Sequence, residues 1–233
     1  MSEQRTVMIT GAAGNLGRAV ASVFHDQGAR LALLDRVPET LLTEFGGDTP
    51  DRLLISANLL DRAEVDAGIA MAVAKFGKID VLCNLAGGFR MGEAVHETSD
   101  QTWDFLFDLN ARSLLNMARA VVPQMIEGGG GKIVNVGAFA AQRGAAQMGA
   151  YIASKSSVIR LTEAMSAELR DKGINVNCVL PTIIDTPENR NAMPDADPSR
   201  WVAPADLASV IAFLASDAAR AVHGAALPVT GLS

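Results

Sequence analysis

One tyrosine and one lysine stand at a spacing that suits proton-transfer chemistry. Tyr151 and Lys155 belong to the segment Tyr-Ile-Ala-Ser-Lys, and on a helix residues four apart project from one face. An ammonium group beside a phenol favours the phenolate, which lowers a pKa of about 10 and lets the tyrosine exchange protons nearer neutral pH. Tyr151 is also the sole tyrosine of the chain. The alternative is an exposed Tyr/Lys pair with no chemical role.

A glycine-rich segment near the start of the chain has the spacing of a phosphate cradle. Residues 10–17 are Thr-Gly-Ala-Ala-Gly-Asn-Leu-Gly, and they follow an apolar run and open a helical pattern. Gly11 permits a tight turn, Gly14 lets the backbone approach a pyrophosphate, and Gly17 allows close helix packing. The helix N-terminus offers N–H groups to the anion, so the segment predicts a dinucleotide fingerprint. A strand-to-helix junction without a ligand is the alternative.

A carboxylate at the end of the second apolar run bears on the choice of dinucleotide. Asp35 closes the run 31–34, where a carboxylate accepts hydrogen bonds from both ribose hydroxyls and repels a 2′-phosphate. NAD is therefore the favoured cofactor. Arg36 keeps NADP possible, because a guanidinium beside the adenosine ribose pairs with a 2′-phosphate. The alternative, which applies if the glycine motif is left aside, is that Asp35 is an ordinary carboxylate in the turn at the end of a strand.

The elements that must position these residues alternate along the chain. Short β-branched and apolar runs are separated by longer segments with a period of about 3.6 residues. The predicted strands are residues 6–10, 30–35, 53–57, 81–85, 132–136, 175–180 and 226–229, and the predicted helices are 16–27, 63–76, 103–126, 152–171 and 204–215. Near-continuous apolar strands that alternate with helices imply a parallel sheet covered on both faces. We expect an α/β fold of three layers, doubly wound like a Rossmann fold, with a seven-stranded parallel sheet.

One long stretch fits neither pattern. Residues 187–204 are irregular and carry prolines at both ends. This stretch predicts a mobile loop over a ligand site, and a polar surface loop without a role is the alternative.

Length and composition bound the class of protein. The 233 residues, 49% of them hydrophobic and 20% charged, favour a globular chain with a single NAD(P)-binding domain over residues 1–233. A net charge of −6 with scattered basic residues argues against nucleic acid as a partner. Residues 1–10 do not resemble a signal sequence and no segment is long enough to span a membrane, so we expect a cytoplasmic protein without membrane contact.

Cysteines and histidines give no sign of a cross-link or a metal. Cys83 and Cys178 lie inside apolar runs, where a free cysteine acts as a small core residue. The three histidines lie far apart without ligand-like spacing. Neither a disulfide nor a metal site is predicted.

Two further motifs complete a resemblance to the short-chain dehydrogenase/reductase family, which runs from Thr6 to the C-terminus. Residues 84–87, Asn-Leu-Ala-Gly, are similar to the family's Asn-x-Ala-Gly after the fourth strand, and Asn110 ends Asp-Leu-Asn on the long predicted helix. The resemblance implies an oxidoreductase that transfers hydride between NAD(P) and a small-molecule substrate. It implies Tyr151 as general acid/base, Lys155 as the residue that binds the nicotinamide ribose and tunes Tyr151, and Asn110 as the holder of a proton-relay water.

The resemblance also implies a cofactor surface drawn from several turns. Ala86 and Gly87 would line the adenosine side, Ile184 in the segment 181–186 would offer its backbone to the carboxamide, and Asn84 would be structural. The full predicted set is Gly11, Gly14, Asn15, Leu16, Gly17, Asp35, Arg36, Asn58, Leu59, Ala86, Gly87, Tyr151, Lys155, Pro181 and Ile184. Plainer interpretations remain, because Asn110 would also serve to bond helix backbone and Ala86-Gly87 to turn the chain.

Three positions depart mildly from the family pattern. Asn15 stands where many relatives have glycine, and we expect it to cap the first helix. Asn58 replaces an aspartate that contacts adenine, and we expect its carbonyl oxygen to bond the adenine amino group. Thr182 replaces a glycine and would narrow the space near the nicotinamide.

The largest departure concerns the substrate. The family's substrate-orienting serine, 13 residues before the tyrosine, is Ala138 in this chain. A similar alanine occurs in the dihydropteridine reductases of this family, whose quinonoid substrate needs less carbonyl polarisation. Two alternatives stay open at this stage: the chain reduces a conjugated imine or quinonoid compound, or Gln147 or Ser154 replaces the missing donor. The expected substrate is thus a small carbonyl, quinonoid or imine compound.

The substrate pocket is only weakly indicated. Ala138, Gln147 and Phe139 are the predicted substrate residues, and Arg90 or Arg143 is the candidate receptor for an anion. The apolar lining would come from Phe89, Met91, Phe139, Met148 and Met193, which would equally suit a protein core.

Two further expectations concern an alternative function and the oligomeric state. Loss of the serine hydroxyl at Ala138 also suits a cofactor-binding, catalytically weak protein that reports redox state to a partner. Relatives in the family pair through helices that correspond to residues 103–126 and 152–171, commonly as homotetramers, so a dimer or tetramer is expected. Leu106, Leu114, Val158 and Leu161 fit such a helix face, and they fit equally a face packed on the chain's own sheet.

Overall fold

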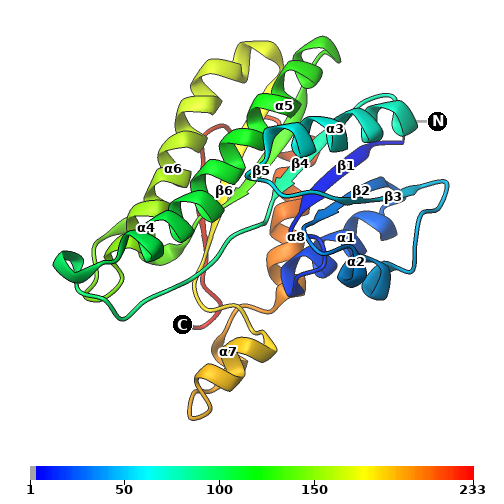
Figure 1. Cartoon of the computed structure of the whole chain (residues 1–233). Coiled ribbons are helices and arrows are strands. Elements are labelled where there is room, and N and C mark those ends of the chain that lie inside the picture. The colour runs from blue at the N-terminus through cyan, green and yellow to red at the C-terminus, as the bar shows by residue number, and fades with distance from the viewer. Residues whose placement is uncertain (1–3) are drawn as a thin grey trace.

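A single parallel sheet organises residues 4–233, which are the residues that the computed structural model describes. Within them seven strands run in the order β3-β2-β1-β4-β5-β6-β7 (Figure 1). The strands are β1 (Thr6–Thr10), β2 (Arg30–Asp35), β3 (Arg52–Ser56), β4 (Val81–Asn84), β5 (Gly131–Val136), β6 (Ile174–Pro181) and β7 (Ala226–Val229). The predicted seven-stranded, doubly wound α/β fold is confirmed. Residues 1–3 of the leading segment lie outside the described residues.

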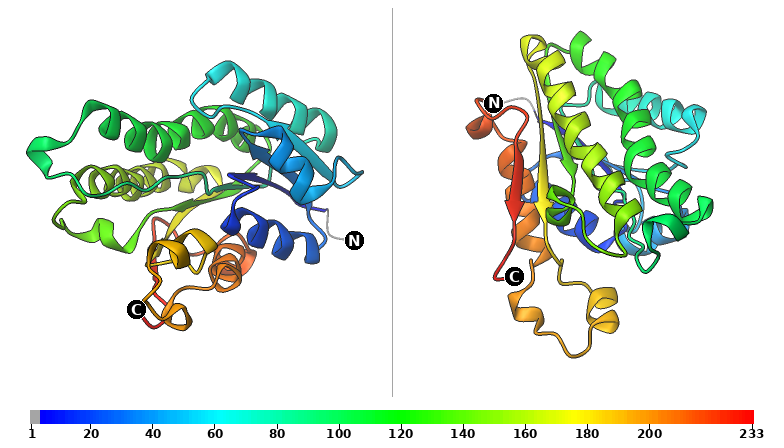
Figure 2. Two further views of the ribbon diagram at one scale, coloured as in Figure 1. Left: turned by 60° about the horizontal axis from the view of Figure 1, so that its bottom comes forward. Right: turned by 90° about the vertical axis from the view of Figure 1, so that its left-hand side faces the viewer.

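Helices cover both faces of this sheet. They are α1 (Asn15–Asp26), α2 (Pro38–Phe45), α3 (Arg62–Phe76), α4 (Asp100–Phe107), α5 (Ser113–Glu127), α6 (Gly149–Leu169), α7 (Pro187–Ala192) and α8 (Pro204–Leu214). Short 3-10 turns lie at Val95–Glu97, Phe139–Gln142, Arg170–Lys172, Pro198–Arg200 and Asp217–Ala219. Figure 2 shows α3, α5 and α6 on one side of the strands and α1 and α8 on the other.

Each face of the sheet has its own apolar core. One core joins the strands to α1 and α8 through residues such as Val20 and Ile211, and the other joins them to α3 and α5 through Ile69 and Val121. Because β1, β4, β5 and β6 are covered on both faces, they are rich in buried apolar residues, the composition from which they were predicted.

The helix predicted at 103–126 is interrupted. A π-helical turn at Asp108–Arg112 separates α4 from α5. Such turns carry one residue more than an α-helical turn and rotate the side chains that follow. Asn110, inside this turn, is buried.

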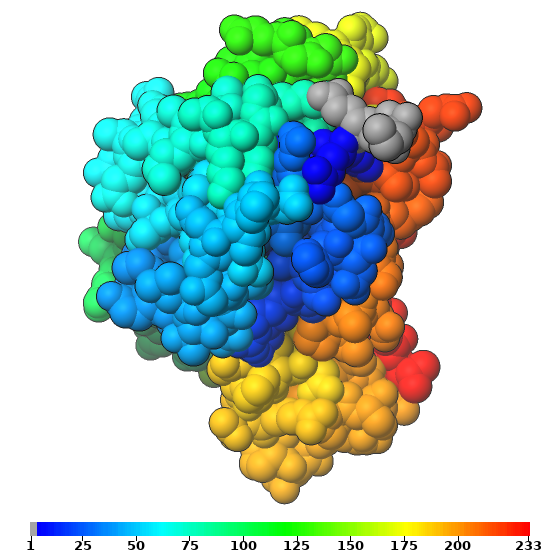
Figure 3. Space-filling view, turned by 90° about the vertical axis from the view of Figure 1, so that its right-hand side faces the viewer, coloured from blue at the N-terminus to red at the C-terminus, as the bar shows by residue number. Residues whose placement is uncertain are grey.

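The stretch predicted to be irregular contains a helix. Residues 187–204 include α7 and a 3-10 turn, and α7 begins with Pro187 after Thr186, whose hydroxyl accepts a hydrogen bond from the Asn189 N–H. A proline at the first helical position preceded by a threonine cap is a strong helix start. Figure 3 shows this segment as a gold lobe that projects beyond the blue N-terminal elements.

The structure of the described residues also tests the predictions about the helix faces, the cysteines and membrane-spanning segments. Leu106, Leu114 and Val158 are buried inside the chain, so they pack on its own elements rather than offering a free helix face. Cys83 and Cys178 are free and buried. No helix in residues 4–233 combines the length and apolar character that crossing a bilayer requires.

Candidate active site

The glycine-rich turn lies between the end of β1 and α1, beside the point where the strand order reverses. Gly11 has φ +65°, a conformation that favours glycine. A Cβ on Gly17 would collide with the carbonyl oxygens of Gly11 and Ala12, so only glycine lets the helix start this close to the turn. Crevices at such strand reversals, beyond the carboxyl ends of the strands, are where open α/β sheets bind ligands.

This turn leaves backbone donors available to an anion. Gly14 precedes α1 as its cap without a side-chain hydrogen bond, and no described residue accepts from the N–H groups of Asn15, Leu16 or Gly17. Unpaired N–H groups and the helix dipole together suit a pyrophosphate. A glycine-rich turn with free first-turn donors thus fits a dinucleotide.

Asn15 does not cap the helix as expected. It is the first helical residue, and its side chain reaches outward instead: Nδ2 donates to Glu188 Oε2 at 2.8 Å and Oδ1 accepts from Arg18 at 2.8 Å. Since the capping position precedes it, the amide is free to join α7 to α1.

Asp35 is oriented by the same turn. Its Oδ2 accepts from the Ala13 N–H at 3.1 Å and its Oδ1 from the Arg36 N–H at 2.7 Å. Each carboxylate oxygen keeps a further lone pair, which suits the two ribose hydroxyls of NAD. The Arg36 side chain is exposed beside it.

The segment after β4, which is predicted to line the adenosine, is joined to the end of β1 by the hydroxyl of Thr10. Thr10 Oγ1 accepts from the N–H groups of Leu85 and Ala86, at 3.1 and 3.2 Å, and so holds the segment after β4 against β1. Asn58 Oδ1 already accepts from Leu60 N–H at 3.1 Å, so only one lone pair of that oxygen is left for adenine. The carbonyl of Leu59 accepts from Asn116 at 2.9 Å.

Tyr151 and Lys155 lie in the first turns of α6. Lys155 is buried, with 6% of its surface exposed, and its Nζ donates to the Val136 carbonyl at 2.9 Å. Burial lowers the pKa of Lys155 to about 8 and raises the pKa of Tyr151 to about 12. The lowered tyrosine pKa expected from the sequence is therefore wrong for this structure, because loss of hydration disfavours the phenolate and the ammonium group bonds a carbonyl instead.

Asn110 is bonded on every side by protein groups. Its Oδ1 accepts from the Gly88 N–H at 2.8 Å, and its Nδ2 donates to the Gly88 carbonyl at 3.1 Å and to Ser154 Oγ at 3.0 Å. Ser154 in turn donates to the Tyr151 carbonyl at 2.8 Å. Asn110 thus ties the segment after β4 to the first turn of α6, and the relay water predicted for it stays a prediction.

Gly87 is the point where these groups converge. A Cβ at Gly87 would lie 3.0 Å from Asn110 Oδ1 and 3.0 Å from Lys155 Nζ, so both polar atoms face the same exposed glycine. We call Asn110, Tyr151, Ser154 and Lys155 the proton-transfer cluster, after the role that the sequence predicts for three of them. The sequence motifs predicted three of its members, and the structure brings all four together.

Ser154 cannot replace the missing hydroxyl at Ala138. Ser154 is fully buried and its hydroxyl both donates and accepts inside the proton-transfer cluster. Ala138 is itself buried, at the start of the turn Phe139–Gln142. Gln147 therefore remains the candidate donor.

A cavity of about 260 Å³ opens beside Tyr151. Its lining comes from Arg90, Met91, Glu93, Thr98, Thr102 and residues 147–151. Gln147 and Met148 are among them, whereas Phe139, Met193 and Arg143 are not. Phe89 is 55% exposed and packs edge-on against the Tyr151 ring, with 4.8 Å between centroids. These residues are therefore surface or pocket residues rather than core.

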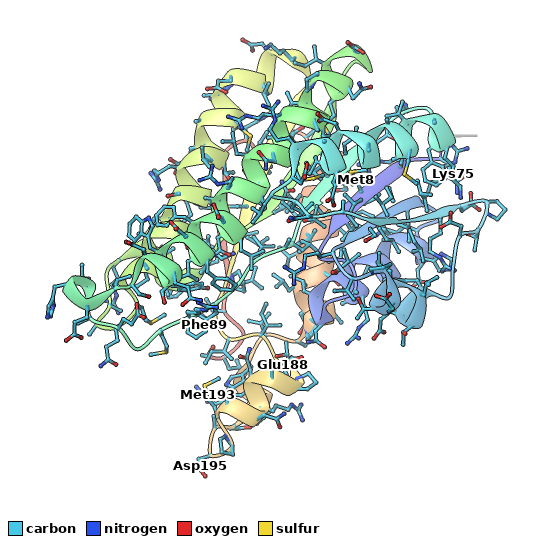
Figure 4. All side chains as sticks on the ribbon, in the orientation of Figure 1. Met8, Lys75, Phe89, Glu188, Met193 and Asp195 are labelled. Carbon is cyan, nitrogen blue, oxygen red and sulfur yellow. The ribbon has the colours of Figure 1, made fainter. Side chains whose placement is uncertain are left out.

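The segment after β6 leads into α7, which lies below Phe89 in Figure 4. Figure 4 places Glu188 and Met193 on the α7 side, opposite Phe89. The Ile184 carbonyl accepts from Asn189 at 2.8 Å, while no described residue accepts from the Ile184 N–H, which leaves that donor for a carboxamide. Pro181 ends β6. The Thr182 hydroxyl donates to the Thr230 carbonyl at 3.0 Å, and the narrowing expected near the nicotinamide stays a prediction.

Comparison with known proteins identifies the family. A model of the short chain dehydrogenases matches residues 5–197. The D-threitol dehydrogenase of Mycolicibacterium smegmatis is 35% identical over 97% of this chain and 92% of its own. The chain belongs to the short-chain dehydrogenase/reductase family of oxidoreductases. A sorbitol dehydrogenase from Cereibacter sphaeroides is 37% identical over 78% of this chain and 71% of its own.

Solved structures agree with this family assignment. The 3-ketoacyl-(acyl-carrier-protein) reductase from Brucella melitensis, complexed with NADH, matches with a TM-score of 0.87 at 30% identity. The match covers 98% of each chain. The family and the fold are thus shown for nearly the whole length of the described residues.

Some functional contacts carried no signal in the sequence. The Val136 carbonyl that receives Lys155 and the Gly88 backbone that receives Asn110 are main-chain groups, whose positions depend on how β5 and the segment after β4 meet α6. The Arg90–Phe105 contact joins residues from separate elements, with 3.8 Å between the guanidinium carbon and the ring centroid.

Proposed function

We propose that this family member is a NAD-dependent reductase of a small carbonyl, quinonoid or imine substrate, with Tyr151 as general acid/base assisted by Lys155 and Asn110. The supporting observation is that Asn110 and Lys155 both lie beside Gly87, while Asn110 also bonds Ser154, which lies between Tyr151 and Lys155 on α6. A bound nicotinamide supplies the hydride donor or acceptor. Every other part of the chemistry falls to residues of this chain.

NAD is the cofactor that Asp35 favours. Its two oxygens are held by the Ala13 and Arg36 N–H groups and retain lone pairs for ribose hydroxyls, while their negative charge repels a 2′-phosphate. The Brucella melitensis structure, which contains NADH, is consistent with this preference. NADP remains the second choice because of the exposed Arg36.

Tyr151 is suited to give a proton. With burial raising its pKa to about 12, the phenol keeps its proton at neutral pH. Reduction needs such a donor, since the oxygen or nitrogen that receives charge must be protonated as hydride reaches the neighbouring carbon. Oxidation would need the phenolate and so gains from alkaline pH.

The alanine at 138 bears on the substrate. No hydroxyl from that position polarises a carbonyl, a contact with an effect on the order of 10²-fold in other oxyanion sites. A quinonoid or imine acceptor needs less polarisation, as in the dihydropteridine reductases that share an alanine there. Gln147, on the cavity beside Tyr151, is the remaining side-chain donor.

The alternative of a redox-reporting binding protein is not favoured. The relatives that match nearly the whole chain carry dehydrogenase or reductase names. The proton-transfer cluster also serves no purpose in pyrophosphate binding. Assembly into dimers or tetramers through α5 and α6 is part of the proposal by resemblance alone.

A substrate panel tests this function. NADH and NADPH oxidation would be measured with ketones, quinones and quinonoid dihydropterin, and NAD reduction with threitol and sorbitol, for the native protein and Ala138→Ser. Turnover of a quinonoid or imine acceptor that Ala138→Ser does not improve supports specialisation at Ala138. NADH binding without any turnover, combined with ketone reduction gained by Ala138→Ser, contradicts the proposed activity and revives the binding-protein hypothesis.

A further inference from the structure

The cavity beside Tyr151 has one wall on which some polar groups are hydrogen-bonded within the protein and one, Arg90, has donors left for a ligand. This wall, residues 90–102, begins with Arg90 and reaches the start of α4. Tyr151 lines the same cavity, so a molecule bound in it lies beside both this wall and Tyr151. The inference that follows rests on the proposed function for its choice of substrates.

Glu93 is fully engaged in holding the wall in place. Its carboxylate accepts from the Ser99 N–H at 3.1 Å, from Ser99 Oγ at 3.2 Å and from Thr102 Oγ1 at 3.0 Å. The hydrogen bond from the Ser99 backbone is the main reason that the pKa of Glu93 is lowered. Thr98 is occupied as well, because its hydroxyl donates to the Ala94 carbonyl.

Arg90 is positioned without using its donors. Its guanidinium stacks over the Phe105 ring, with 3.8 Å from its carbon to the ring centroid. No described residue accepts a hydrogen bond from the Arg90 side chain, and no described carboxylate forms an ion pair with it. A stacking contact holds the guanidinium plane and leaves its N–H edge for a planar acceptor.

The two sides of the cavity are joined through Gln147. Its backbone has φ +61°, and its carbonyl accepts from the Gly92 N–H at 2.9 Å. This bond ties the wall at residues 90–102 to the turn that leads to Tyr151. A substrate bound by Arg90 would therefore lie in a cavity whose two sides are joined.

We propose that the substrate carries a carboxylate and that Arg90 binds it, so the protein reduces small oxo acids or carboxylated imines. Guanidinium and carboxylate match in bidentate geometry. The neighbouring Glu93 carboxylate offsets part of the positive charge of Arg90, which disfavours a dianionic phosphate more than a single carboxylate. Arg143, the other candidate cation, does not line the cavity.

Matched substrate pairs test this assignment. The acids 2-oxobutanoate, acetoacetate and levulinate would each be compared with their methyl esters for kcat/KM with NADH, in native protein, Arg90→Gln and the control Arg143→Gln. We expect at least one acid to be preferred over its ester by about tenfold or more. Arg90→Gln should abolish the preference by slowing the acid alone, and Arg143→Gln should keep it. Equal use of acid and ester, or a preference that survives Arg90→Gln, overturns the proposal.

A binding measurement separates this proposal from the proposed function. Ligand-observed NMR would follow levulinate and methyl levulinate with the NADH complexes of the native and Arg90→Gln proteins. Selective binding of levulinate that disappears in Arg90→Gln supports the carboxylate site even where no substrate is turned over, and in that case the proposed reaction alone fails. Binding of neither compound, or of both equally, overturns the carboxylate site whatever the panel shows.

Discussion

The proton-transfer cluster, which includes Tyr151, and the cavity wall at residues 90–102 differ in how their polar groups are paired. In the cluster, Asn110 and Ser154 are buried and their hydrogen-bonding groups are paired within the protein. On the wall, Glu93 is paired, but Met91 is more than half exposed and no described residue accepts a hydrogen bond from the Arg90 side chain. Groups that must keep one position through each turnover are buried and paired, whereas groups that recognise a substrate must stay solvated and unpaired until it binds.

Removal of the Tyr151 hydroxyl is the sharpest way to separate the two sides. Tyr151→Phe deletes the proton donor without altering the ring that packs against Phe89, so we expect kcat to fall by about 10³-fold. The dissociation constant of NADH, measured by fluorescence titration, should change less than about twofold, because phosphate and ribose contacts lie elsewhere. Retention of a tenth or more of the native kcat would show that Tyr151 is not the proton donor.

The buried charge of Lys155 predicts a stability that depends on pH. Its pKa of about 8 lies below the ordinary value of 10.5, so the unfolded chain holds the proton more tightly. The contribution of Lys155 to stability should therefore grow as pH rises from 8 to 10.5, by about 3 kcal/mol in all. Tyr151 and the buried thiols of Cys83 and Cys178 have raised pKa values and lose stability as the solution becomes alkaline, so the effect of Lys155 must be read as a difference between variants.

Lys155→Met tests this dependence directly. Because the variant has no ammonium group to bury, its free energy of urea unfolding at pH 7 should exceed that of the native protein, and this difference should shrink as pH rises from 8 to 10. Lys172→Met, at an exposed lysine, should keep the pH dependence of the native protein. A difference between Lys155→Met and the native protein that stays constant from pH 8 to 10 would contradict the burial of this charge.

Asn110→Ala tests whether the hydrogen bonds of Asn110 support catalysis or only stabilise the fold. The change leaves the Gly88 N–H and carbonyl unpaired, and we expect a loss of about 2–4 kcal/mol in stability together with a fall in kcat of about tenfold or more. Asn177→Ala is the matched control, because Asn177 is buried and bonds backbone at Val222 and Ala225, far along the sheet. The control should lose stability with kcat unchanged. Equal kcat in both variants would assign Asn110 to the fold alone.

The smallest effect is expected where α7 meets the glycine-rich turn. Glu188 bonds Asn15 at 2.8 Å, beside the free N–H groups of α1, and its negative charge opposes a pyrophosphate there. Glu188→Gln keeps an oxygen for Asn15, so we expect NADH to bind about two- to fivefold more tightly at low salt, with the gain fading as salt rises. Glu44→Gln, at the ion pair with Arg18, serves as the control and should change affinity less. Weaker NADH binding in Glu188→Gln would show that the contact supports the cradle instead.

Features that depend on local pattern were predicted well. The strands β1, β2 and β7 have the predicted bounds, because apolar runs bounded by turn residues mark buried strands. Asp35 and the glycine turn were predicted together because consecutive residues form the turn and the strand that follows α1 carries the carboxylate. The short helices α2 and α7 were missed, since they have only eight and six residues and bury one residue and none, respectively.

The types and spacing of residues by themselves determined the doubly wound sheet, the cradle at Gly11–Gly17 and the pairing of Tyr151 with Lys155, because each is encoded within a few neighbouring positions. Tertiary structure alone decided which way the Tyr151 pKa moves, that Ser154 braces Asn110 rather than facing substrate, and that Arg90 rather than Arg143 borders the cavity. The reason is physical. Burial and hydrogen-bond partners depend on elements distant in the chain, and only the packed fold brings them within reach of one another.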